Sequence, residues 1–316
     1  MNICSMKTSA AVVAVIMMGW MMGCAPKPFK PDLTHTYNRI QPKAITVDGY
    51  QLVYTVTGNG PPIILLHGFG AQGWMWEYQQ EALAKYFTVY TLDLLGHGYS
   101  DRPHIAYTPD LFIDSVKGFM TELEMTRATL IGNSLGAGVA MGIALNYPHL
   151  TDKLVLIGGF PQGVSEKAAL MAYRVFLRFE PVFLLRIGFH LSGKGLLRST
   201  LEKLVVDKSL ITDDVIERAY KFRKLAGSAH ALFSSRNNIR RWEEHYAPRI
   251  PEITTPTLVV WGTEDPLFPI PVGEELHQQI PNSKFRGIKG AGHLTMWEKP
   301  EETNAAILEF RLGKSK

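Results

Sequence analysis

The chain has 316 residues, of which 46% are hydrophobic and 20% are charged, and its formal net charge is +4. This composition is ordinary for a globular protein, and no stretch of the sequence suggests disorder or an internal repeat. The length fits one large α/β domain with an insertion. Cys4 and Cys24 are the only cysteines, and both lie near the start of the chain. The folded part therefore has no disulfide and no cysteine metal site.

The first predicted element is a secretory signal at residues 1–23. Lys7 precedes an uncharged run that ends at Cys24, and its apolar part of about 15 residues is too short for a comfortable membrane span. A small residue directly before a cysteine resembles the bacterial lipobox, although Met21 stands where that motif usually has leucine. The resemblance implies that Cys24 is lipidated, and Ala25 favours sorting to the outer membrane. The alternatives are an uncleaved anchor and an ordinary signal peptide.

Residues 24–43 are predicted to form an extended tether, because Pro26, Pro28 and Pro31 stiffen this stretch. A lipid anchor followed by a tether keeps the folded part beside a membrane. We therefore expect a protein of the bacterial cell envelope that is held at the outer membrane through its lipid.

The folded part begins with a predicted hairpin, since apolar residues alternate on both sides of the turn Asp48-Gly49. Thr108-Pro109 is typical of a helix start, and apolar residues at helical spacing follow it up to Leu123. Several other runs have the pattern expected of buried strands, at 63–66, 88–92, 128–132, 153–157 and 257–261, and the last strand is expected at 283–288. Strands that alternate with helices imply a mostly parallel sheet covered on both faces. We assign residues 44–159 and 248–316 to this α/β core.

Residues 160–247 contain no strand-like run and are predicted to form a helical cap over the site. The stretch 171–191 is rich in phenylalanine and leucine, and Pro181 interrupts it. Residues 161–246 contain 15 Lys and Arg against 9 Asp and Glu, whereas the rest of the chain after Cys24 contains 17 against 20. A basic, aromatic-rich lid suits anionic lipid headgroups. Solvated helix faces explain the same charges equally well.

The sequence Gly132-Asn133-Ser134-Leu135-Gly136 has the G-x-S-x-G pattern of a nucleophile elbow. In this motif a strained corner between a strand and a helix exposes a serine hydroxyl above a sheet. The small residues that follow, Gly138, Ala140 and Gly142, allow the helix to lie close to the sheet. A packing turn that happens to contain serine is the alternative, so partners are needed to give Ser134 a function.

With this elbow and four further motifs the chain resembles the α/β-hydrolase superfamily from Ile45 to Phe310. The other matching motifs are His67-Gly68-Phe69-Gly70, Asp93 to Ser100, Gly262-Thr263-Glu264-Asp265 and Gly290-Ala291-Gly292-His293. The resemblance implies the α/β-hydrolase fold, with helices on both faces of the sheet, and the chain order of nucleophile, acid and histidine.

Ser134 is a weak nucleophile at neutral pH and needs a base within hydrogen-bond reach. His293 is the candidate base, because imidazole both accepts and donates a proton near pH 7. Asp265 is the candidate acid that orients the ring. Glu264 competes for this role, but Asp265 has the family position three residues after Gly262.

The resemblance assigns the oxyanion hole to the backbone N–H groups of Phe69 and Leu135. It leaves His67 as a structural residue that braces its loop. Trp74 and Trp297 are candidates for substrate binding, although buried aromatic residues fill cores equally often.

We interpret the chain as a serine hydrolase that cleaves carboxylic esters with an apolar acyl or alcohol portion, from a small molecule or a lipid, through an acyl-enzyme. We expect no metal, no organic cofactor, no nucleic acid and no obligate protein partner. Carbon–carbon bond hydrolysis of meta-cleavage type is the alternative, because that group shares the triad, a similar Gly-Asn-Ser elbow and Trp297-Glu298. However, Leu294 stands where that group usually has tryptophan. A third hypothesis is a relative that binds a ligand without turnover.

Overall fold

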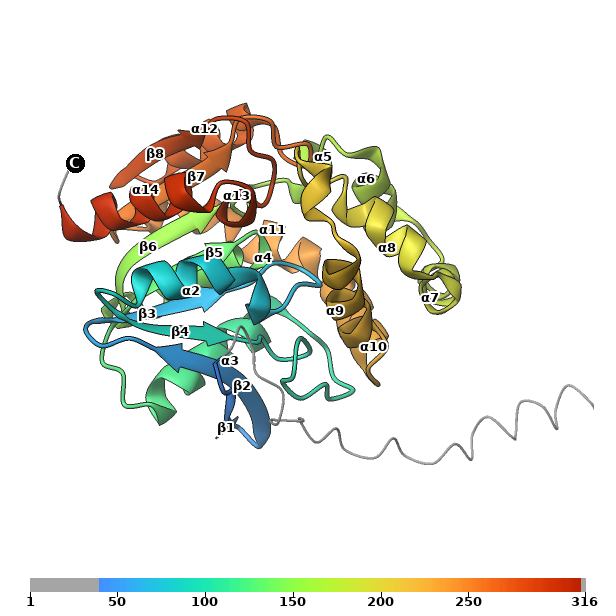
Figure 1. The fold of residues 1–316 in the computed structure, drawn as a ribbon, viewed down its shortest axis with the longest axis horizontal. Coiled ribbons are helices and arrows are strands. Elements are labelled where there is room, and N and C mark those ends of the chain that lie inside the picture. Colours follow the sequence, from blue (N-terminus) through green and yellow to red (C-terminus); the bar gives the residue numbers. More distant parts are fainter. Residues whose placement is uncertain (1–39, 314–316) are drawn as a thin grey trace, which may run out of the picture. The chain divides into compact units, whose positions relative to one another are not determined.

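Figure 1 shows the fold in a computed structural model, which describes residues 40–313. The predicted signal, Cys24 and nearly all of the predicted tether lie outside the described residues. Within residues 40–313, no helix has both the length and the apolar character needed to cross a bilayer.

Eight strands form one sheet in the order β1-β2-β4-β3-β5-β6-β7-β8. The pairs β1–β2 and β2–β4 are antiparallel, and all the other pairs are parallel. This is the mostly parallel sheet that the alternating pattern predicts. The strands are β1 (Lys43–Val47), β2 (Tyr50–Thr57), β3 (Pro62–Leu66), β4 (Thr88–Leu92), β5 (Ala128–Asn133), β6 (Thr151–Ile157), β7 (Thr257–Gly262) and β8 (Ser283–Ile288).

The predicted hairpin is confirmed. Asp48 and Gly49 join β1 to β2, and their φ angles are +47° and +82°. Positive φ at both central residues is characteristic of the two-residue turn whose twist matches that of the flanking strands.

Both faces of the sheet are buried, which explains the continuous apolar runs. Ile64, Leu66 and Leu130 belong to a large hydrophobic cluster with side chains of α3 (Pro109–Glu122), α4 (Leu135–Asn146) and α12 (Ile270–Gln279). The alternate residues Ile63 and Leu65 are also fully buried but lie outside that cluster. Because successive side chains of a strand point to opposite faces, these residues face a second helical layer. That layer contains α2 (Glu77–Leu83), α13 (Thr295–Glu298) and α14 (Pro300–Leu312), which contact one another (Figure 1).

The helix start at Thr108-Pro109 is also confirmed. The Thr108 side chain accepts a hydrogen bond from the backbone N–H of Leu111 over 3.2 Å, which caps α3. Short 3₁₀ helices connect several elements, namely η1 (Gly73–Trp76), η2 (Pro148–Leu150), η3 (Lys208–Leu210) and η4 (Ala247–Glu252).

Between β6 and β7 the chain is helical and contains no strand, as the sequence predicts. Pro181 stands between α6 and α7. Because a proline has no backbone N–H to donate, it interrupts the helical stretch, as the sequence predicts. In Figure 1, α6, α7 and α8 lie away from the sheet, with α9 and α10 beside them. The helices of this segment are α5 (Val164–Lys167), α6 (Met171–Arg178), α7 (Val182–Leu191), α8 (Lys194–Leu201), α9 (Asp213–Arg223), α10 (Ser228–Asn237) and α11 (Ile239–His245).

Candidate active site

Ser134 occupies the sharp corner between β5 and α4. Its φ is +50° and its ψ is −115°, a strained conformation for a residue with a side chain. Gly136 makes the corner sterically feasible. A Cβ atom there would lie 2.1 Å from the carbonyl oxygen of Leu66 and 2.7 Å from that of His67. The elbow therefore packs directly against the end of β3, as the G-x-S-x-G pattern requires.

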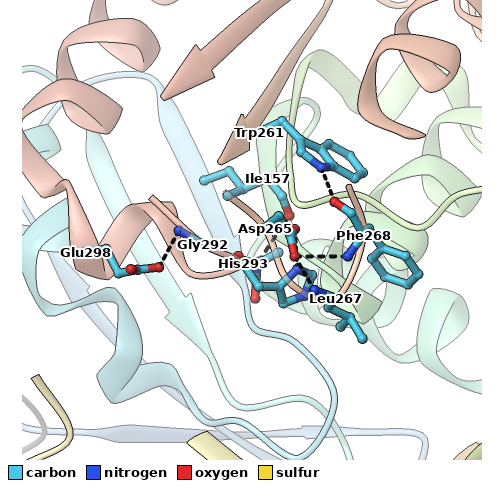
Figure 2. A network of polar contacts seen from close by, with 9 residues as sticks. Ile157, Trp261, Asp265, Leu267, Phe268, Gly292, His293 and Glu298 are labelled. Carbon is cyan, nitrogen blue, oxygen red and sulfur yellow. Dashed lines mark hydrogen bonds and ion pairs between the residues drawn. The ribbon is translucent and has the colours of Figure 1, made fainter. Parts of the chain in front are cut away.

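The structure brings Asp265 and His293 together, from the loops after β7 and β8. The Nδ1 atom of His293 lies 2.8 Å from Oδ2 of Asp265, and both side chains are buried (Figure 2). The other carboxylate oxygen, Oδ1, accepts hydrogen bonds from the backbone N–H groups of Leu267 at 2.8 Å and Phe268 at 3.0 Å. The carboxylate is fixed by these bonds, so it accepts from Nδ1–H and leaves Nε2 of His293 as an acceptor. No corresponding contact to His293 is recorded for Glu264.

The end of β6 links the serine to the histidine. The carbonyl oxygen of Ile157 accepts hydrogen bonds from the backbone N–H of Ser134 at 3.0 Å and from the Asn133 side chain at 3.1 Å. Asn133 Nδ2 also lies 3.4 Å from the carbonyl oxygen of His293. The next residue, Gly158, has φ of +51°, and a Cβ atom there would lie 3.1 Å from the His293 ring. Ser134, Asp265 and His293 thus follow the carboxyl ends of β5, β7 and β8, in the parallel part of the sheet where β6 lies between β5 and β7.

The loop after β3 lies against the serine. A Cβ atom on Gly68 would be 3.3 Å from Cβ of Ser134, and Phe69 follows immediately. His67 braces this loop, since its Nε2 accepts from the N–H of Leu94 at 3.1 Å and its Nδ1 lies 2.9 Å from the carbonyl oxygen of Gly68. The two bonds require a neutral ring with the proton on Nδ1. Burial lowers the pKa of His67 from 6.5 to about 4, which keeps the ring neutral.

Of the two residues assigned to the oxyanion hole, Leu135 directly follows Ser134, and Phe69 follows Gly68, which lies against the serine. Leu135 is the first residue of α4, and the first N–H groups of a helix have no partner within the helix. Phe69 belongs to the loop that His67 braces, next to Gly68. These positions suit two converging N–H donors, and the helix dipole adds a favourable potential for negative charge.

The segment after α8 is tied to the histidine loop by contacts that sequence reasoning missed. The backbone N–H of His293 donates to the carbonyl oxygen of Leu204 at 2.9 Å. The carboxylate of Glu298 accepts from the N–H of Gly292 at 2.8 Å and from that of Val206 at 2.6 Å. Figure 2 shows Glu298 beside Gly292. In the sequence only the Trp297-Glu298 pair pointed to this region, and the pair by itself does not predict which residues Glu298 contacts.

Aromatic side chains surround this region. The ring of Phe69 packs edge-on against Phe176 of α6, with centroids 5.8 Å apart. Phe268 packs edge-on against His293 at 5.8 Å and against Tyr173 at 6.4 Å. The surroundings of the candidate triad are therefore apolar on the side of the cap.

Trp74 and Trp297 also lie together, with ring centroids 6.0 Å apart and both side chains buried. The indole N–H of Trp74 donates to the Gln72 side chain, and the guanidinium of Arg218 lies over the Trp74 ring. None of these contacts involves Ser134 or His293, so the assignment of the pair to substrate binding stays a prediction. Within residues 40–313, no group of three or more His, Cys, Asp or Glu side chains has the geometry of a metal site.

A doubly covered, mostly parallel sheet with a strained serine at a strand–helix corner is the architecture of an α/β hydrolase. The chain belongs to this family, since the family model described as "alpha/beta hydrolase fold" matches residues 61–300.

The similar proteins include hydrolases of more than one chemistry. A 2-hydroxy-6-oxononadienedioate/2-hydroxy-6-oxononatrienedioate hydrolase of Paraburkholderia phymatum is 32% identical over 268 residues, which cover 81% of this chain and 89% of the relative. The structure of a meta-cleavage product hydrolase from Pseudomonas fluorescens has a TM-score of 0.71 at 26% identity and covers 86% and 97% of the two chains. A thermophilic esterase from Thermogutta terrifontis has a TM-score of 0.68 at 26% identity, with 86% and 98% covered.

Proposed function

We propose that the chain is a serine hydrolase in which Ser134 is the nucleophile, His293 the general base and Asp265 the residue that orients the histidine. The observation that carries this proposal is the 2.8 Å contact between His293 Nδ1 and Asp265 Oδ2, beside a strained serine at the end of β5. Because Nδ1 of His293 donates to Asp265, Nε2 is left to accept the proton of Ser134.

The proposed reaction begins when the Ser134 oxygen attacks a substrate carbonyl and its proton passes to His293. The N–H groups of Phe69 and Leu135 stabilise the negative charge on the carbonyl oxygen. The bond beside the carbonyl then breaks, the leaving group takes the proton from His293, and an acyl-enzyme remains on Ser134. Water, deprotonated by His293, releases the acid and restores the serine.

Carbon–carbon bond hydrolysis of meta-cleavage type is the first candidate for the bond that is cleaved. The support comes from the relatives, because the named sequence relative and one of the two structures described are hydrolases of this kind. In this case the leaving atom that takes the proton is carbon.

Hydrolysis of carboxylic esters with an apolar portion is the second candidate. It is supported by the aromatic contacts of Phe69, Phe176 and Phe268, which provide an apolar surrounding, and by the esterase among the structural neighbours. In this case the leaving atom is the alcohol oxygen.

One panel separates the two candidates. The purified protein is given nitrophenyl esters of increasing chain length and a 2-hydroxy-6-oxo-dienoate, and a Ser134→Ala variant serves as the control. We expect turnover of at least one class, lost in the variant, and labelling of Ser134 by a fluorophosphonate. If neither class is turned over and the fluorophosphonate leaves Ser134 unlabelled, the proposal is wrong.

We also propose that Cys24 carries a lipid anchor in a bacterial envelope. The support is the sequence alone, namely the uncharged run and the Gly23-Cys24 junction. Processing in cells should be blocked by globomycin and by Cys24→Ala. Membrane extraction that is identical for the variant and the parent chain would refute the anchor.

A further inference from the structure

Exposed apolar side chains are concentrated on three helices of the cap. Among residues 40–313, twelve large hydrophobic side chains are exposed, and eight of them belong to α6, α7, α8 or the residue after α6. The most exposed are Leu191 at 81%, Met171 at 64% and Phe183 at 58%. We call this set the cap face; it consists of Met171, Val175, Phe179, Phe183, Leu184, Ile187, Leu191 and Leu196.

The spacing of these residues places them on one side of each helix. On α6 and just after it they recur every four residues, at Met171, Val175 and Phe179, and on α7 Ile187 and Leu191 continue the same spacing. Residues four apart lie on the same face of a helix. Each helix therefore presents an apolar stripe to solvent.

The opposite side of α6 and α7 carries aromatic side chains that pack against the rest of the protein. Phe176 of α6 contacts Phe69 and Phe233, and Phe189 of α7 contacts Phe233 with centroids 5.7 Å apart. On the inner side of α6 and α7 these rings are partly buried, and the outer side is open to solvent. A group of large apolar side chains that is open to solvent on one face commonly marks a site that binds another protein or a membrane.

Basic residues predominate in the segment that carries the cap face. Residues 171–201 contain five Lys and Arg against one Glu, so this segment alone carries a net charge of +4. Three of these cations form ion pairs, Arg178 with Glu166, Lys194 with Glu217 and Arg198 with Asp213. The side chains of Arg178 and Lys194 remain about half exposed and that of Arg198 one third exposed, and such surface pairs contribute little. With all its acids counted, the stretch 161–246 still has 15 basic against 9 acidic residues.

We propose that the cap face binds a membrane surface that contains anionic lipids, with its apolar side chains below the headgroups and its cations beside the phosphates. A second copy of the chain fits less well, because a symmetric contact would bring the same cations together. The apolar run of residues 8–24 also fits less well as the partner. It contains no acidic residue to pair with the cations, since the first acidic residue of the chain is Asp32. The proposal does not depend on the chemistry of Ser134.

Tryptophan fluorescence in the full-length chain tests this proposal. The tryptophans within residues 40–313 are all buried, and Trp20→Phe removes the remaining one from the comparison. Leu191→Trp then reports on the cap face, and Leu312→Trp, at a site 41% exposed on α14, is the matched control. Vesicles with brominated acyl chains quench a tryptophan that enters them.

We expect strong quenching and a blue shift for Leu191→Trp with vesicles that contain phosphatidylglycerol, much weaker quenching with pure phosphatidylcholine, and weakening by salt. Leu312→Trp should change little. Adding Phe183→Ser, Leu184→Ser and Ile187→Ser to the reporter should abolish the quenching, whereas Tyr78→Ser with Tyr86→Ser should leave it intact.

The proposal is overturned if both reporters are quenched equally or if neither is quenched. It is also overturned if Leu191→Trp is already blue-shifted without lipid, because the face is then covered by protein. In that case sedimentation shows whether a second copy covers the cap face. The parent chain would be dimeric, and the variant with Phe183→Ser, Leu184→Ser and Ile187→Ser would be monomeric. Unchanged circular dichroism and unfolding midpoints establish that the variants are folded.

Discussion

The backbone N–H of His293 donates a hydrogen bond to the carbonyl oxygen of Leu204 over 2.9 Å. Leu204 belongs to the segment that follows α8, so the proposed base is held by the cap as well as by the core. Glu298 reinforces this connection, because its two carboxylate oxygens accept separately from Gly292 and Val206. A change in the cap near Leu204 is therefore expected to reach the histidine directly.

Glu298→Gln should weaken this connection. A glutamine has a single acceptor oxygen, so one of the two N–H groups of Gly292 and Val206 loses its partner. Val206 is exposed and its N–H can bond to water, whereas Gly292 is buried, and an unsatisfied buried donor costs about 1–3 kcal/mol of stability. We expect kcat to fall more than KM changes, because the histidine loop shifts. Urea unfolding and steady-state kinetics measure the two effects.

The control for this variant is Glu301→Gln, at an exposed position on α14. It should leave both the unfolding midpoint and kcat unchanged. If Glu298→Gln has the unfolding midpoint and the kcat of the parent chain, the two hydrogen bonds contribute neither to stability nor to catalysis.

Asp265→Asn should preserve the fold but reduce kcat by about 10⁴-fold. The amide oxygen is able to keep the bonds from Leu267 and Phe268, which directs the amide NH₂ towards His293 Nδ1. The imidazole then accepts at Nδ1 and carries its proton on Nε2, which is the wrong tautomer for a base towards Ser134. Glu264→Gln is the matched control, and it should retain wild-type kcat. An equal loss in both variants would argue against Asp265 as the orienting residue.

The buried His67 should make the protein sensitive to mild acid. Its pKa is lowered to about 4 in the folded state, compared with 6.5 for an unperturbed imidazole. The unfolded chain therefore binds the proton more readily, so the stability is fully present above pH 6.5 and decreases as the pH falls towards 4. The difference of about 2.5 pKa units corresponds to about 3 kcal/mol. His97, whose pKa burial lowers to about 3, adds to the effect.

Urea unfolding at pH 7.0, 5.5 and 4.5 measures this dependence. His67→Gln should be less stable at pH 7 but should lose less stability on acidification than the parent chain. Replacement of the exposed His149 by glutamine should leave the slope unchanged. The assignment to His67 fails if its variant retains the full slope.

The parts of the molecule that follow a local pattern were predicted from the sequence. The Asp48-Gly49 turn, the Thr108 cap and the buried strands depend on neighbouring residues, and the structure confirms them. The contacts of Leu204 and Glu298 with the histidine loop join residues far apart in the chain, and no local periodicity encodes them. The exposure of the cap face was equally hidden, because an apolar stripe of α7 has the same sequence pattern whether it is packed or open.

Phe176 should influence the size of the accepted substrate. Its ring lies between Phe69, at the proposed oxyanion hole, and Phe233, at centroid distances of 5.8 and 6.0 Å. Phe176→Ala removes this ring and opens space on the cap side of the site, at a cost of about 2 kcal/mol, less than for a fully buried phenylalanine. We expect kcat/KM to rise for long or bulky acyl groups relative to short ones, by about tenfold, because the larger group then fills the space. A series of soluble esters of graded length, with Phe183→Ala as an exposed control on α7, measures the change. A uniform loss over the whole series would place Phe176 outside the path of the acyl group.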